Sequence, residues 1–231
     1  LILECQPALI AQQKWKISQL TSGSEIQIKK KAVELSGAML CELNEKLRVQ
    51  VVLKLMHADE VLAVSEHEVS GLARNEWGGA GYMPELLAAF CMPNDTAVTA
   101  VLKGAGEVLR RSGEQPSLDG YQSKSRKRVW QMASAIWSAV SAKRLVYSEP
   151  PASFETEGQK VRTPSDIWEG GLVTCLDSAL LSAAAFEQAG LYPVIAIVKG
   201  HALCGVWLQP QQLPSLITED CVDIRKYISL N

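Results

Sequence analysis

Cys175 stands where a helix is expected to begin, and a thiol in that position can act as a nucleophile. Thr174 is a good N-cap residue and Asp177 follows three positions later, which is the spacing of a capping box and places Cys175 in the first helical turn. The positive end of the helix dipole and the free backbone N–H groups there favour the thiolate form. The same N–H groups could stabilise an oxyanion formed by attack on an acyl carbon. The spacing therefore predicts a cysteine nucleophile, with a small buried structural cysteine as the alternative.

A cysteine nucleophile needs a general base within hydrogen-bond reach, and the chain has three histidines. His57 and His67 lie in a region expected to form strands of a separate unit. His201 stands at the start of a strand in the same region as Cys175. His201 is therefore the predicted base, and the alternative is a strand-end histidine bonded to a backbone carbonyl.

A zinc site is the competing interpretation of the same residues, because thiolate and imidazole groups are the usual zinc ligands. Its ligands would be Cys175, His201, Cys204 and Cys221. In an extended strand, however, His201 and Cys204 point to opposite faces, which argues against a shared metal ion. We therefore expect neither a metal nor another cofactor.

The elements that position these residues follow from the hydrophobic pattern, which changes near Pro84. Before this point, alternating and β-branched residues over 25–70 predict antiparallel strands. After it, a helical period predicts helices over roughly 84–92, 96–112 and 125–144. The last of these should bury one stripe that includes Val129, Met132, Ala133, Ile136, Trp137 and Val140.

A long loop precedes the candidate nucleophile. Residues 147–165 hold three prolines and one glycine, and loops of this length are often functional. The helix that begins with Cys175 should end near Gly190, in the position expected of a C′ glycine. Two strands should follow, over 192–198 and 202–208, with Lys199 to His201 between them.

Composition bounds the class of protein. The chain has 231 residues, 47% of them apolar, and a formal net charge of −2, so nucleic acid is not the default partner. The basic run from Lys124 to Arg128 is better interpreted as a solvated helix face than as a phosphate site, and Trp77, Trp130 and Trp137 as core or interface aromatics. Six dispersed cysteines, no apolar run long enough to span a membrane and no secretory signal favour a soluble cytoplasmic protein.

Several segments resemble a known family. GQKVRTPSDIW (158–168) and TCLDSALLSAAAFEQAGLYPVIAIVKGHALCGVWL (174–208) resemble the transglutaminase-like, papain-type cysteine hydrolase core. The likeness is greatest to the N-terminal domain of unknown function of large bacterial DNA-helicase-related proteins. The segments NEWGG (75–79), PELLAAFCMPND (84–95), LDGYQ (118–122) and PPASFE (150–155) also resemble that subgroup, so the likeness covers roughly residues 70–230.

The resemblance implies roles for individual residues. Cys175 would be the nucleophile and His201 the general base, and a third residue on a following strand would orient the imidazole. Candidates for the third residue are Asp220 and Asp223, or a residue beyond Asn231. Gln159, on the loop before the nucleophile, is a candidate oxyanion donor, with a solvated glutamine as the alternative.

These observations predict an α+β chain. Residues 1–83 should form a β-sandwich-like region, and residues 84–231 a helical segment plus a transglutaminase-like core that belongs to a longer polypeptide. The predicted function is cysteine-dependent acyl chemistry on a peptide or amide, most simply proteolysis. By resemblance, the partners would be a protein or peptide substrate and the helicase-like and nuclease-like domains of the longer protein, which would act on DNA or in phage defence. The alternative is a non-catalytic interaction module of such a protein, and direct nucleic-acid binding is not expected.

Overall fold

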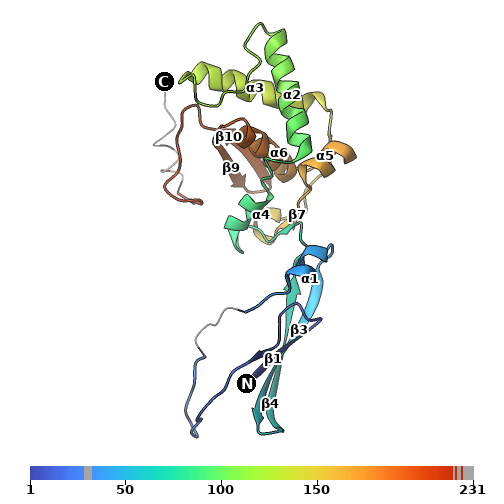
Figure 1. Ribbon diagram of the computed structural model, residues 1–231, viewed down its shortest axis with the longest axis vertical. Helices are drawn as coiled ribbons and strands as arrows, with labels where there is room; N and C mark the ends of the chain where they lie inside the picture. Colours follow the sequence, from blue (N-terminus) through green and yellow to red (C-terminus); the bar gives the residue numbers. More distant parts are fainter. Residues whose placement is uncertain (29–32, 221, 223–224, 226–231) are drawn as a thin grey trace. The chain divides into compact units, whose positions relative to one another are not determined.

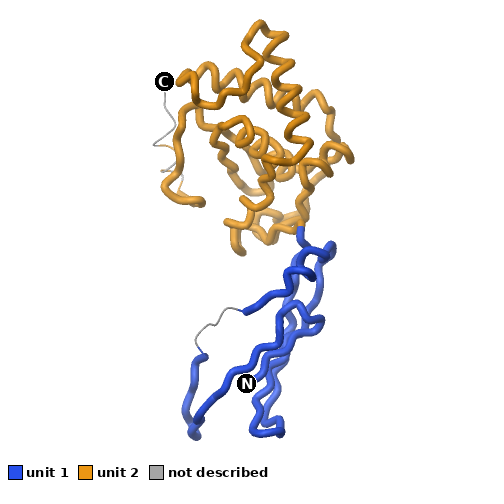
Figure 2. The backbone as a smooth tube through the Cα atoms, viewed as in Figure 1, with its two compact units in different colours: residues 1–74 blue, residues 75–231 orange. Residues whose placement is uncertain are grey.

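A computed structural model gives the arrangement of residues 1–28, 33–220, 222 and 225 (Figure 1). The chain is of the α+β class, with 33% of the described residues in helices and 24% in strands. It divides into two compact units, Leu1–Arg74 and Asn75–Asn231 (Figure 2). None of the helices in the described part of the chain is both long and apolar enough to span a bilayer.

The first unit is built on an antiparallel sheet. Its strands are β1 (Ile2–Gln6), β2 (Gln13–Lys14), β3 (Leu47–His57) and β4 (Glu60–Gly71), in the order β2-β1-β3-β4. The two long strands form a hairpin, and Ala58 in its turn has a φ of 51°. Alternation places Val49 in the core of this unit while β4 is exposed along almost its whole length.

The segment between β2 and β3 differs from the sequence prediction. Residues 25–28 form no strand, residues 29–32 of the predicted strand lie outside the described residues, and Leu35 forms an isolated bridge with Ile10. A short helix, α1 (Gly37–Glu42), begins after Ser36, because the Ser36 side chain accepts a hydrogen bond from the backbone N–H of Met39. The described residues of this unit thus form one sheet, and a second sheet of a sandwich stays a prediction.

The two units separate at Arg74, whereas the change of hydrophobic period suggested Pro84. Residues after Arg74 belong to the second unit because β5 (Glu76–Trp77) pairs with β7 (Gln159–Lys160). Trp77 is among the largest fully buried side chains of the chain. The pairing partner lies far along the sequence, so a local pattern could not reveal it.

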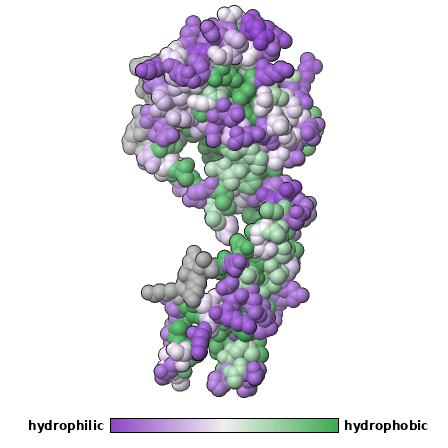
Figure 3. Space-filling view, in the orientation of Figure 1, coloured by the Kyte–Doolittle hydropathy of each residue, from purple (hydrophilic) through white to green (hydrophobic). Residues whose placement is uncertain are grey.

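The helices of the second unit follow their capping signals. Asp95 caps α2 (Thr96–Arg111), Ser125 caps α3 (Arg126–Ala142) and Thr163 caps α5 (Pro164–Gly170). The shorter elements are η1 (Pro84–Phe90), β6 (Val146–Tyr147), α4 (Phe154–Glu157) and β8 (Leu172–Val173). Hydrophilic side chains gather over the end of this unit formed by α2 and α3 (Figure 3).

Helix α6 (Cys175–Gln188) is the centre of the second unit. It contacts α2, α3, α5 and the hairpin of β9 (Pro193–Val198) and β10 (His201–Val206), all within this unit (Figure 1). Its sequence is apolar on almost every side, as expected of a helix enclosed by other elements. Gly190 follows its end with a φ of 75°, as the sequence predicted.

One prediction about α3 is wrong. Trp137 was placed on the buried stripe, but its side chain is 67% exposed, and that of Trp130 is 63% exposed. Val129, Met132, Ala133 and Ile136 are buried as predicted, and Ala135 and Ala139 are buried as well. Ala139 lies against Gly104 of α2, where a larger side chain would not fit.

Gly158 should be essential for the pairing of β5 with β7. Its φ is 85°, and a Cβ atom there would overlap the backbone oxygen of Trp77. We expect Gly158→Ala to lower the free energy of unfolding by at least about 2 kcal/mol. Gly170→Ala is the matched control, because a Cβ at Gly170 meets nothing within 4 Å. Denaturant unfolding followed by tryptophan fluorescence measures both, and equal stability of the two variants would contradict the prediction.

Candidate functional site

The start of α6 is fixed by a reciprocal capping box, as the sequence predicted. The Thr174 side-chain oxygen accepts a hydrogen bond from the Asp177 backbone N–H at 3.2 Å, and Asp177 Oδ2 accepts one from the Thr174 N–H at 3.0 Å. Cys175 is therefore the first residue of the helix. Its position is set by these two hydrogen bonds, which do not involve its own side chain.

Asp177 does more than cap the helix. Its carboxylate is fully buried and accepts two further hydrogen bonds from Arg162, from the backbone N–H at 2.9 Å and from Nη1 at 2.8 Å. A buried carboxylate is costly unless it is paired and hydrogen-bonded, and here it accepts bonds from three donors. Asp177 thus joins the start of α6 to the segment that follows β7.

Gln159 reaches the same helix start from β7. Its side-chain Nε2 donates to Thr174 Oγ1 at 3.0 Å, and both side chains are buried. The Gln159 Oε1 atom and the indole N–H of Trp77, its partner across the strand pair, are buried without a hydrogen-bond partner among the described residues. Gln159 therefore supports the cap that positions Cys175, and its role as an oxyanion donor stays a prediction.

Cys175 lies at the edge of a core cluster rather than in open solvent. Its side chain is 3% exposed and belongs to an apolar cluster that also contains Trp77, Phe154 and Ala202. The half-exposed Tyr147 of β6 forms a hydrogen bond with it. Desolvation first, and then the charge and hydrogen bond of Cys175, raise the pKa of the Tyr147 phenol.

His201 is the first residue of β10 and pairs with Val198 across the hairpin. Its side chain is exposed, whereas the next residue, Ala202, is buried in the cluster that contains Cys175. Side chains thus alternate between the two faces of β10, as the sequence predicted, and His201 lies on the face opposite Ala202. No hydrogen bond joins His201 to Cys175 in the part of the chain that the structure describes, so their catalytic pairing stays a prediction.

The candidates for a third catalytic residue are not brought to this site by any described contact. Asp220 is exposed, and its Oδ1 accepts a hydrogen bond from the backbone N–H of Val222. Asp223 lies outside the described residues. Sequence reasoning did not single out Tyr147, because its contact with Cys175 depends on the pairing of two short parallel strands, β6 and β8.

Two other cysteines of this unit are poor nucleophiles. Burial, with the neighbouring carboxylate of Glu187, raises the pKa of Cys91 to about 12, and burial with the neighbouring Cys91 raises that of Cys204 to about 12. Cys91 Sγ donates to Glu187 Oε2 at 3.5 Å. Among the described residues, no three His, Cys, Asp or Glu side chains gather in a way that could hold a metal ion.

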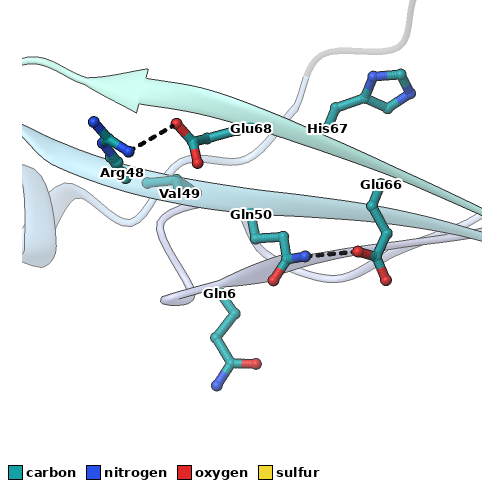
Figure 4. Close-up of a pocket in the computed structure, with 7 residues that line it drawn as sticks. All are labelled: Gln6, Arg48, Val49, Gln50, Glu66, His67 and Glu68. Atoms are coloured by element: carbon teal, nitrogen blue, oxygen red, sulfur yellow. Dashed lines mark hydrogen bonds and ion pairs between the residues drawn. The ribbon is translucent and has the colours of Figure 1, made fainter.

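A polar hollow in the first unit offers no nucleophile. Figure 4 shows it between Gln6 of β1 and side chains of β3 and β4, where Arg48 pairs with Glu68 and Gln50 donates to Glu66. The ion pair is largely exposed and should contribute little to stability. The candidate nucleophile and base that the sequence suggested, Cys175 and His201, both lie in the second unit.

No protein-family model, curated protein or solved structure matches the chain.

The buried carboxylate should make Asp177 more important for stability than a similar cap elsewhere. We expect Asp177→Ala to cost about 3 kcal/mol, because it leaves the backbone N–H groups of Thr174 and Arg162 and the Arg162 guanidinium without their acceptor. Asp166 occupies the same position in the capping box of α5 but is exposed, so Asp166→Ala should cost about 1 kcal/mol. Denaturant unfolding of both variants compares them, and a larger loss for Asp166→Ala would contradict this account.

Thiol labelling tests the ranking of the cysteines. At pH 8, Cys91 and Cys204 should react with iodoacetamide at least about a hundredfold more slowly than the exposed Cys41, because a pKa of about 12 keeps their thiols protonated. Cys175 should react faster than these two, and His201→Ala should slow Cys175 but not Cys41. Residue-resolved mass spectrometry measures each rate. Labelling of Cys204 at the rate of Cys41 would contradict the ranking.

Proposed function

We propose that the second unit performs cysteine-dependent acyl chemistry on peptide or amide substrates, with Cys175 as nucleophile and His201 as general base. The observation that carries this proposal is the start of α6. A thiol stands at the first position of a helix whose N-terminus is fixed by Thr174, Asp177 and Gln159. Such a position supplies both the helix dipole and free N–H groups next to the sulfur.

The chemistry would proceed through a thioacyl intermediate. The Cys175 thiolate adds to the carbonyl carbon of an amide, and the C–N bond breaks when the His201 imidazolium protonates the leaving amine. Water, deprotonated by His201, then cleaves the thioester and releases the acid, which completes hydrolysis. An incoming amine in place of water would complete transglutamination. Tyr147 and the Cys175 thiol contact each other, so the substrate would displace the phenol from the sulfur.

The proposal extends to the fold and the setting of the chain. The helix-to-hairpin order of α6, β9 and β10 supports a transglutaminase-like, papain-type core for the second unit, and the sheet of the first unit supports a sandwich-like region. By the sequence resemblance, the chain would be the N-terminal part of a cytoplasmic bacterial protein with helicase-like and nuclease-like domains, which would be its partners in phage defence. Asp223 remains the candidate to orient His201.

The alternative function is a non-catalytic interaction module. It is favoured by the burial of Cys175 and by the exposed aromatic side chains of α3. Trp77, which the sequence suggested as a core or interface aromatic, is buried in the core and therefore offers no surface to a partner.

Two substitutions decide between these functions. Cys175→Ala and His201→Ala should each abolish the biological activity of the longer parent protein, and the double variant should lose no more, because both residues act in one chemical step. His67→Ala is the matched control, since this exposed histidine lies in the other unit. Thermal melts establish that each variant is folded. Full activity of a well-folded Cys175→Ala protein would end the enzyme hypothesis and leave the interaction module.

A further inference from the structure

Positive charge is concentrated in the segment that contains α3. Residues 123–148 hold six of the 23 lysines and arginines of the chain and none of its 25 aspartates and glutamates. This segment therefore has a formal charge of +6, and the rest of the chain, with 17 cations and 25 anions, has a formal charge of −8. A net charge of −2 conceals this separation.

Several of these cations are exposed and form no ion pair among the described residues, so they can bind an anionic partner. Arg128 is committed to the fold, because it bonds to Asp119 and to the carbonyl oxygens of Gln115 and Ser117. Lys143 lies over the ring of Trp168. Within the described residues, by contrast, no ion pair is formed by the exposed side chains of Lys124, Arg126 and Lys127, which precede and open α3.

Two exposed tryptophans share a face of α3 with these cations. Trp130 and Trp137 are seven residues apart, which places them on one side of the helix about 10 Å apart along its axis. Arg126 and Lys127 lie one turn before Trp130, and Ser134 and Ser141 follow at helical spacing. We call Arg126, Lys127, Trp130, Ser134, Trp137 and Ser141 the α3 face.

We propose that the α3 face binds single-stranded nucleic acid, with bases stacked on Trp130 and Trp137 and phosphates held by Arg126 and Lys127. The cluster of cations attracts a polyanion electrostatically. A flat indole ring can stack with any base. The large apolar side chains exposed on the α3 face are both tryptophans, with serines between and beyond them. Insertion into a membrane or docking of an apolar helix would instead need a continuous apolar stripe, whereas Ser134 lies between the two tryptophans. Serine hydroxyls suit the phosphate groups of a nucleic acid.

The α3 face is separate from the Cys175 chemistry and does not depend on it. Stacking and phosphate contacts leave different signatures, which makes the assignment testable. Loss of a stacked base lowers affinity without changing the salt dependence. Loss of one phosphate contact lowers the slope of log affinity against log salt concentration by about 0.7 for single strands.

The test is fluorescence anisotropy of a labelled oligothymidylate of about 20 nucleotides titrated with the full chain. Trp130→Ala and Trp137→Ala should each weaken binding on the order of tenfold, with the salt slope unchanged. Lys127→Ala should lower the slope by about 0.7. Trp137→Phe should retain part of the affinity, because a smaller ring still stacks.

Matched controls come from the same unit. Tyr82, which is 66% exposed, and the exposed Lys103 of α2 lie outside the α3 face, so Tyr82→Ala and Lys103→Ala should leave the affinity unchanged. Cys175→Ala should also bind normally. The substituted tryptophans are exposed, and thermal melts should show unchanged stability.

Three results would overturn the proposal. The first is an absence of oligothymidylate binding by the wild-type chain. The second is wild-type affinity in the variant that lacks both tryptophans. The third is tryptophan-dependent binding of polyglutamate or of phosphatidylserine vesicles without binding of oligothymidylate, which would assign the α3 face to an acidic protein or to a membrane.

Discussion

The buried carboxylate of Asp177 is the interaction on which the second unit depends. It accepts hydrogen bonds from the backbone of Thr174 and from the backbone and side chain of Arg162, and so joins the central helix to the strand segment beside it. Because an unpaired buried carboxylate would be very costly, these contacts must form together. The first turn of α6 is therefore held in place by the surrounding unit. This turn fixes the position of Cys175.

The sequence predicted those parts of this arrangement that are local. Thr174 and Asp177 are three residues apart, and Gly190 follows the helix at the position where a left-handed residue is needed, so both ends of α6 could be read directly. The alternation along β10 likewise separates His201 from Ala202. These features depend on backbone geometry over a few residues, which is the range over which sequence patterns are informative.

The rest depends on contacts between distant residues. The pairing of Trp77 with Gln159, the ion pair of Arg162 with Asp177 and the contact of Tyr147 with Cys175 bring together segments that are separate in sequence. The exposure of Trp137 has a similar cause, because its apolar character assigned it to the buried stripe while Ala135 and Ala139 are the residues buried there. Burial is decided by the shape of the partner, and a single helix does not contain that information.

The strand pair of β5 and β7 has a consequence for how the chain folds. Residues 76–77 can pair only with residues 159–160, which lie more than 80 positions later in the sequence. The hairpin of β3 and β4 instead joins two strands that are adjacent in sequence. Closing so long a loop has an entropic cost that is met only when the intervening helices have collapsed. During synthesis the first unit can therefore complete its hairpin early. The second unit cannot assemble the environment of Cys175 until the residues through β10 have left the ribosome, because Ala202 of β10 belongs to the cluster that encloses the thiol.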